Sequence, residues 1–120
     1  MYFLRKDSHK QATRKELLKT LKGYKIDLLM IDGDHGDEGV KKYWQMYSAL
    51  VKQNGIIVFH DILFHPKVKA CKVNRLWNEI KRRYRYREFL DRKDDRGWGQ
   101  KGGIGIIYYK DTRKRNRKCL

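Results

Sequence analysis

Apolar residues along this chain are gathered into short runs, and their spacing predicts the secondary structure. Residues 26–31 (IDLLMI) and 56–59 (IIVF) are almost free of polar interruption. Continuous runs of this length are typical of strands buried on both faces, as in a parallel sheet. A shorter burst at 2–5 (YFLR) predicts a further strand, and residues 87–90 (REFL) and 103–110 (GIGIIYYK) predict an antiparallel pair.

Segments between these strands show apolar residues at helical spacing. Residues 11–22 have an apolar stripe that Gly23 terminates, and similar stripes run through residues 38–52 and 67–84. Because strands and helices alternate, the pattern predicts an α/β fold with right-handed crossovers. Residues 112–120 (TRKRNRKCL) have no apolar period, and we expect them to form a basic tail.

Composition narrows the class of protein. A length of 120 residues allows a single domain. The net charge of +16 favours polyanions as partners, nucleic acid among them. Two cysteines without CxxC spacing argue against a disulfide scaffold or a zinc site and favour a reducing cytoplasm. No apolar stretch approaches the roughly 20 residues that span a bilayer, so we expect a cytoplasmic protein without a membrane span.

The carboxyl ends of the predicted strands are where an α/β sheet binds its ligands. Polar clusters lie at these ends: Asp7-Ser8, Asp32 to His35, and His60-Asp61. If Asp32, His60 and Asp61 converge, they suit a divalent ion: magnesium or calcium if oxygens dominate, manganese, iron or zinc if the imidazole binds. Alternatively, His60 is a strand-end histidine bonded to a loop carbonyl, and spacing alone leaves both interpretations open.

A second candidate feature is the segment KRRYRYR at 81–87, which interleaves basic and aromatic side chains. This composition is compatible with binding of RNA or single-stranded DNA. A charge run on a helix is more often a solvated face. A basic nucleic-acid-binding module is therefore kept as the alternative hypothesis. His65, beside Pro66, is expected to be an ordinary loop residue, and Trp77 a core residue.

Several segments together indicate a family. In chain order they are DSH, IDLLMIDGDHGDEGVKKY, NGIIVFHDI, NRLWNEIK and GWGQKGGIGIIYYK. Over roughly residues 2–110 the chain resembles the C-terminal portion of class I S-adenosylmethionine-dependent methyltransferases. The likeness is greatest to the small-molecule and sugar O-methyltransferase branch that includes cephalosporin-hydroxylase-like proteins. It implies an incomplete Rossmann-like fold over residues 1–111, with a mostly parallel sheet and a C-terminal antiparallel pair.

The resemblance also implies roles for particular residues. Implied cofactor contacts are Asp7, Ser8 and Asp32, implied ligands of a metal such as Mg²⁺ are Asp32, His60 and Asp61, and implied catalytic residues are His35 and His60. The cofactor would be S-adenosylmethionine, and the acceptor a hydroxyl group of a small molecule or sugar. In such enzymes the ion binds the acceptor hydroxyl and lowers its pKa.

The same resemblance implies that the first two strands of the family and its Gly-rich cofactor loop are absent. That absence argues against activity in the isolated chain. By the family's strand order, the missing strands lie between residues 2–5 and 26–31. The strand at 26–31 should therefore expose an apolar edge, which could pair with a partner subunit or a second copy.

Overall fold

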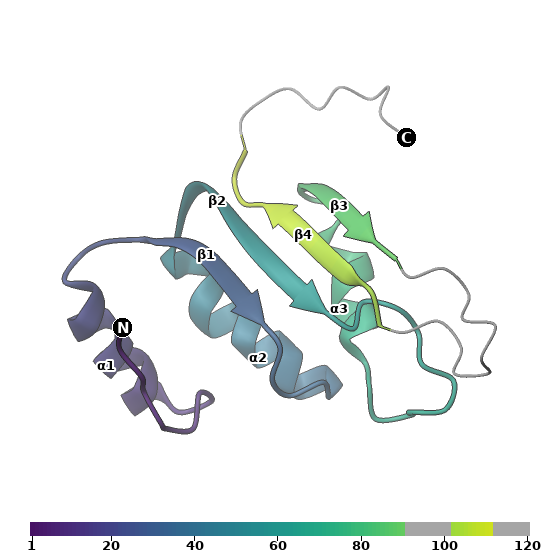
Figure 1. Ribbon diagram of the computed structural model, residues 1–120, viewed down its shortest axis with the longest axis horizontal. Coiled ribbons are helices and arrows are strands. Elements are labelled where there is room, and N and C mark those ends of the chain that lie inside the picture. The colour runs from purple at the N-terminus through teal and green to yellow at the C-terminus, as the bar shows by residue number, and fades with distance from the viewer. Residues whose placement is uncertain (91–101, 112–120) are drawn as a thin grey trace.

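The structure, a computed structural model, describes residues 1–90 and 102–111 and has an α/β architecture (Figure 1). In chain order its elements are α1 (Gln11–Leu21), β1 (Ile26–Ile31), α2 (Asp37–Tyr47), the short 3-10 helix η1 (Ser48–Leu50), β2 (Val51–His60), α3 (Val73–Ile80), β3 (Arg85–Phe89) and β4 (Ile104–Tyr108). The predicted fold class is confirmed. The predicted basic tail at 112–120 lies outside the described residues.

The described strands form one sheet in the order β1-β2-β4-β3. Strands β1 and β2 run parallel, whereas β4 runs antiparallel to both β2 and β3. The predicted C-terminal antiparallel pair is therefore present beside a parallel pair. Ile31 of β1 pairs with Phe59 of β2, so both strands deliver their next residues to the same edge of the sheet.

The predicted strand at residues 2–5 is wrong. These residues precede α1 without regular structure, and the side chains of Tyr2 and Phe3 are each 83% exposed. A strand needs a neighbour to satisfy its main-chain hydrogen-bonding groups, and the only described strand beside β1 is β2. An apolar triplet without a pairing partner gains too little burial to become ordered in a sheet.

Two predicted helices are longer than the structure shows. Helix α2 ends at Tyr47, and strand β2 already begins at Val51. Helix α3 begins at Val73 instead of residue 67, because the segment that follows Pro66 forms a loop. The main-chain N–H of Lys72, at the end of this loop, donates a 2.8 Å hydrogen bond to the carbonyl of His35. The loop is thereby tied to the turn after β1.

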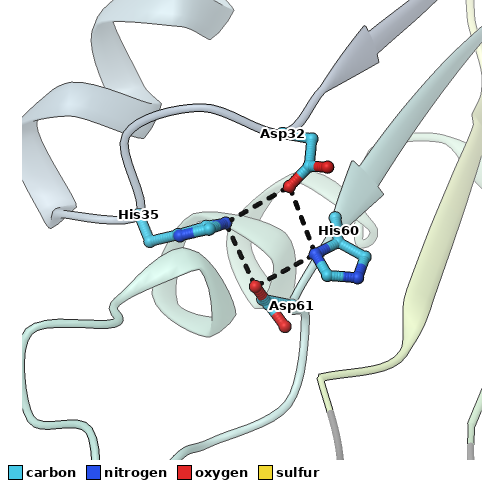
Figure 2. Close-up of side chains that lie close together, drawn as sticks. All are labelled: Asp32, His35, His60 and Asp61. Carbon is cyan, nitrogen blue, oxygen red and sulfur yellow. Dashed lines mark ion pairs between the residues drawn. The ribbon is translucent and has the colours of Figure 1, made fainter.

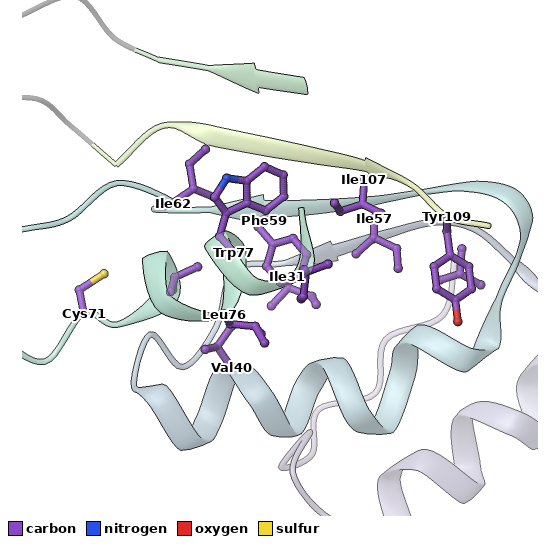
Figure 3. Close-up of a cluster of buried hydrophobic side chains, with 13 residues drawn as sticks. Ile31, Val40, Ile57, Phe59, Ile62, Cys71, Leu76, Trp77, Ile107 and Tyr109 are labelled. Atoms are coloured by element: carbon purple, nitrogen blue, oxygen red, sulfur yellow. The ribbon is translucent and has the colours of Figure 1, made fainter. Parts of the chain in front are cut away.

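The core lies between one face of the sheet and helices α2 and α3 (Figure 3). Ile57, Phe59 and Ile107 have no exposed surface, because alternate residues of a strand point to the same face. The indole of Trp77 is 1% exposed and packs over Gly105, where an added Cβ would lie 2.5 Å from the ring. Trp77 is therefore a core residue, as predicted.

The other face of the sheet carries exposed apolar side chains, so the prediction that residues 26–31 are buried on both faces is wrong for the described residues. Leu28 and Met30 of β1 are 57% and 54% exposed, and Phe89 of β3 is 54% exposed. Strand β1 also stands at the end of the strand order, so its free side has no partner among residues 1–90 and 102–111 (Figure 1). The predicted apolar edge is present, and pairing of this edge with another chain stays a prediction.

The basic and aromatic segment at 81–87 does not belong to a long helix. It begins after α3 and continues into β3. The guanidinium of Arg85 lies 4.1 Å from the ring centroid of Tyr108 and 3.1 Å from the carboxylate of Asp111. Because Arg85 is engaged within the domain, nucleic-acid binding by this segment stays a prediction. Within the described ranges, no helix has the length and apolarity to cross a bilayer.

Candidate metal centre

The ends of β1 and β2 bring two acids and two histidines together (Figure 2). His60 Nδ1 lies 3.2 Å from Asp32 Oδ1 and 3.0 Å from Asp61 Oδ2. From the turn after β1, His35 Nε2 lies 3.5 Å from Asp32 Oδ1 and 3.1 Å from Asp61 Oδ2. Nitrogen and oxygen atoms therefore alternate around the group, which we call the His/Asp cluster: Asp32, His35, His60 and Asp61.

The turn between β1 and α2 fixes the position of His35. The Asp34 carboxylate accepts a 2.8 Å hydrogen bond from the main-chain N–H of Gly36, a local bond that is typical of Asp in turns. The His35 carbonyl accepts the bond from Lys72 described above. Because the turn is held from within and by the loop before α3, the imidazole is directed back toward the strand ends.

Asp61 occupies an unusual backbone position. Its φ is 60°, in the left-handed region that non-glycine residues seldom adopt. Its N–H donates a 3.0 Å hydrogen bond to the Gly103 carbonyl, which anchors the residue beside β4. An added Cβ at Gly102 would lie only 1.8 Å from Asp61 Oδ1. The missing side chain at Gly102 therefore leaves the space in which the Asp61 carboxylate lies.

The four side chains are better placed to bind a cation than to form hydrogen bonds with one another. His35 Nε2 and His60 Nδ1 are shielded from solvent, yet neither is aligned for a hydrogen bond with the carboxylates nearby. One ligand atom from each member of the His/Asp cluster lies within 4.8 Å of all the others. Buried polar atoms without partners cost free energy, and a divalent cation between these four atoms would remove that cost.

Beside the cluster is an open cleft of about 380 Å³. It is lined by Asp34, His35, Gly36, Asp61, His65, Val68, Ala70 and Cys71. The first part of this lining is polar, and the last three residues form an apolar wall. Burial raises the pKa of the Cys71 thiol, which keeps that wall uncharged. His35 and Asp61 belong both to the cluster and to the cleft.

The sequence-predicted residues divide into two groups. Asp32, His60 and Asp61 lie together as their strand ends require, although their roles as ligands stay predictions. Asp7 and Ser8 do not follow a strand, because no strand forms at residues 2–5. Ser8 Oγ donates a 3.1 Å hydrogen bond to the Tyr43 hydroxyl, which in turn accepts a 3.4 Å bond from the N–H of Asp34. Ser8 is therefore linked to the turn beside the cluster.

Two residues of the site had no predicted role. His65 Nε2 lies 3.5 Å from Asp61 Oδ1, and Gly102 makes room for the same carboxylate. The spacing of four residues between Asp61 and His65 was the only sequence signal for the first contact. The approach of Gly102 depends on how the segment before β4 passes the end of β2, which no local pattern encodes.

Comparison with known proteins identifies the family. A family described as methyltransferase domain matches residues 3–62, half of the chain. The chain belongs to this methyltransferase family. The resemblance inferred from its motifs is therefore confirmed at the level of the family. A comparison with curated proteins finds no match.

Solved structures share the fold. Cofactor-bound Rv0187 from MTB is 20% identical with a TM-score of 0.52, and the match covers 81% of this chain and 46% of that protein. A putative O-methyltransferase from Klebsiella pneumoniae is 14% identical with a TM-score of 0.50, covering 78% and 46%. The chain thus spans less than half the length of these relatives. At such identities the likeness establishes the fold, and it agrees with a partial methyltransferase architecture.

Proposed function

We propose that this chain forms the metal- and acceptor-binding part of an S-adenosylmethionine-dependent O-methyltransferase. The observation that carries the proposal is the His/Asp cluster at the carboxyl edge of β1 and β2, within a methyltransferase fold. Ligands of open α/β sheets bind at this edge. The adjoining cleft is large enough for a small molecule, because ligand pockets usually measure about 300–1,000 Å³ and this one measures about 380 Å³.

Each residue of the cluster receives a role from its place. Asp32, His60 and Asp61 would hold a divalent cation. A cation bound there supplies Lewis acidity, which lowers the pKa of an acceptor hydroxyl. His35 lines the cleft as well as the cluster, so we assign it to orienting the acceptor hydroxyl. His60 does not line the cleft, which favours a ligand role over direct contact with the acceptor.

The apolar wall of the cleft would hold the body of the acceptor. Val68, Ala70 and Cys71 offer no charged group, whereas the polar end carries Asp61 and His35. An acceptor bound between them would place its hydroxyl at the cluster and its hydrocarbon part against the loop. Such positioning is a main contribution of the protein to group transfer, because it replaces a bimolecular encounter by a fixed geometry.

Cofactor binding is the second half of the proposal. Asp7, Ser8 and Asp32 are proposed contacts to S-adenosylmethionine, and the link from Ser8 through Tyr43 to Asp34 supports a position close to the cluster. We further propose that additional polypeptide covers the free side of β1 and the exposed side chains beside it, and completes the cofactor site. The 46% coverage of the solved relatives and the uncovered apolar face support this.

The proposal is tested by ligand-detected NMR on the whole chain. A panel of small phenols, diols and sugars is screened with and without a divalent cation. We expect hydroxyl-bearing ligands to bind only when the cation is present. In Asp32→Ala we expect this cation-dependent binding to be lost. Asp27→Asn is the matched control, because Asp27 lies on the same strand, is 80% exposed and pairs with Lys52 instead of the cluster. Binding that ignores the cation, or is unaffected by Asp32→Ala, contradicts the proposal.

A further inference from the structure

We propose that the His/Asp cluster selects a first-row transition ion such as Zn²⁺ or Co²⁺ over Mg²⁺ and Ca²⁺. This inference rests on the proposed function for a cation site at the cluster, and deepens it by naming the class of ion. It departs from the expectation of a metal such as Mg²⁺ that the sequence resemblance implies. The reason lies in the donor atoms and their spacing.

The donor set is half nitrogen. His35 Nε2 and His60 Nδ1 face the two carboxylate oxygens alternately around the cluster (Figure 2). Mg²⁺ and Ca²⁺ are hard cations that take oxygen ligands, and Mg²⁺ usually keeps several of its waters. Imidazole nitrogen suits zinc, copper, iron and nickel. Two imidazoles among four converging donors therefore favour a borderline ion over a hard one.

The spacing of the donors fits a small ion. Neighbouring nitrogen and oxygen atoms are 3.0–3.5 Å apart around the cluster. Zinc binds nitrogen and carboxylate oxygen at about 2.0–2.2 Å, and tetrahedral ligands at that distance lie about 3.3–3.6 Å from one another. Donors no more than 4.8 Å apart need only small movements to close around such an ion. Ca²⁺, with six to eight oxygen ligands at about 2.3–2.6 Å, would have to spread them.

The two imidazole nitrogen atoms that face the cluster have no hydrogen-bond partner among the described residues. His35 Nε2 and His60 Nδ1 are each shielded from solvent and make no hydrogen bond within the described part of the chain. The carboxylate oxygens of Asp32 and Asp61 lie close to these nitrogen atoms but are not aligned with them for hydrogen bonds. Lone pairs directed toward a common ion explain both the shielding and the poor alignment.

The Asp61 carboxylate is placed to bind an ion through Oδ2 alone, because its other oxygen, Oδ1, lies away from the two histidines of the cluster. Oδ2 faces both histidines of the cluster, whereas Oδ1 lies toward His65 at 3.5 Å and over Gly102. The carboxylate therefore presents one oxygen to the ion while the other stays in its own environment. Binding through one oxygen suits a four-coordinate ion, whereas Ca²⁺ often binds a carboxylate through both oxygens.

The experiment titrates metal into the full chain after removal of bound ions with a chelator. Zn²⁺ affinity is measured by competition with a chromophoric chelator, Mg²⁺ affinity by calorimetry, and Co²⁺ by its visible absorption, which reports coordination number and ligand type. We expect one Zn²⁺ or Co²⁺ per chain, bound at least about 100-fold more tightly than Mg²⁺. The Co²⁺ spectrum should show a four- or five-coordinate ion with nitrogen and oxygen ligands.

Variants separate the cluster from other histidines. His60→Asp replaces a nitrogen donor by oxygen, so we expect Zn²⁺ affinity to fall at least about 10-fold and the preference over Mg²⁺ to shrink. His9→Asn is the matched control, because His9 Nε2 is likewise shielded and without a hydrogen bond but lies outside the cluster. It should leave both affinities unchanged. Circular dichroism establishes that each variant is folded.

Several results would overturn the inference. They are Mg²⁺ binding as tight as Zn²⁺, a six-coordinate Co²⁺ spectrum, or a sulfur-to-cobalt band that reveals binding at a cysteine. The wild-type Co²⁺ spectrum decides even if His60→Asp does not fold. Zn²⁺ preference without any cation-dependent hydroxyl ligand would leave this inference intact and contradict the proposed function. Mg²⁺ preference with such ligands would do the reverse.

Discussion

Replacing Gly102 by alanine should weaken cation binding more than it weakens the fold. The added Cβ would lie 1.8 Å from Asp61 Oδ1 and 3.1 Å from Asp61 Cα. The φ of Gly102 is outside the left-handed region, so alanine meets no backbone penalty there. The carboxylate must therefore rotate away. That rotation moves Oδ2 from its present contacts with His35 and His60, at 3.1 and 3.0 Å.

The magnitude follows from what is lost. Disturbing a group that positions a metal ligand typically costs about 10–100-fold in affinity, which corresponds to about 1.4–2.8 kcal/mol. Overpacking costs about 1–3 kcal/mol of stability, and we expect the lower end here. The reason is that the Asp61 side chain borders an open cleft and can turn into it. Gly102→Ala should thus lose about 1 kcal/mol of folding free energy while losing at least tenfold in affinity for Zn²⁺.

Gly105→Ala provides the opposite pattern as a control. Its Cβ would lie 2.5 Å from the Trp77 indole, a rigid ring that is 1% exposed and has no space to move. We expect about 2–3 kcal/mol of destabilisation with Zn²⁺ affinity within about twofold of wild type. Urea unfolding and chelator competition measure the two quantities separately. Equal Zn²⁺ affinity of Gly102→Ala and wild type, or parallel losses in both variants, would refute the argued position of Asp61.

Two further predictions concern hydrogen bonds within the domain. Burial by itself raises the pKa of Glu88, but hydrogen bonds from Lys81 and Trp77 outweigh it and hold the pKa below its ordinary 4.5. Glu88→Gln should therefore cost about 1 kcal/mol at pH 7, and urea unfolding should show this deficit disappearing as the pH falls below 4.5. Tyr43→Phe removes the hydroxyl between Ser8 and the turn after β1, and should cost about 1 kcal/mol and increase amide exchange around Ser8; unchanged exchange there would contradict the contact.

Much of the sheet could be predicted from local patterns. The apolar runs at 26–31 and 56–59 fall within β1 and β2, as predicted. Their apolarity did not report burial on both faces of β1, because Leu28 and Met30 are more than half exposed. The antiparallel pair was recognisable from the glycines and β-branched residues of β4. Periodicity also placed Trp77 in the core. These features depend on neighbouring residues in the chain, which is the information that a pattern contains.

Features that depend on distant contacts could not be read in this way. The burst at 2–5 has strand-forming residues but no strand beside it, and nothing in its own letters reveals that lack. The helix predicted over residues 67–84 begins before the true start of α3 at Val73, since Pro66 and the bond from Lys72 to His35 hold the first part as a loop. In both segments tertiary context overrides local propensity.

The His/Asp cluster depends partly on local sequence and partly on contacts between distant residues. Its members lie at or shortly after the ends of β1 and β2, in a unit of β1, α2, η1 and β2 that falls inside the family match at 3–62. The parallel register of Ile31 with Phe59 alone makes the next residues neighbours, and a slip of one residue would send Asp32 to the opposite face. Because the helix-covered face buries this unit, the cluster does not depend on whatever covers Leu28 and Met30. Cation binding should therefore be measurable on this chain by itself.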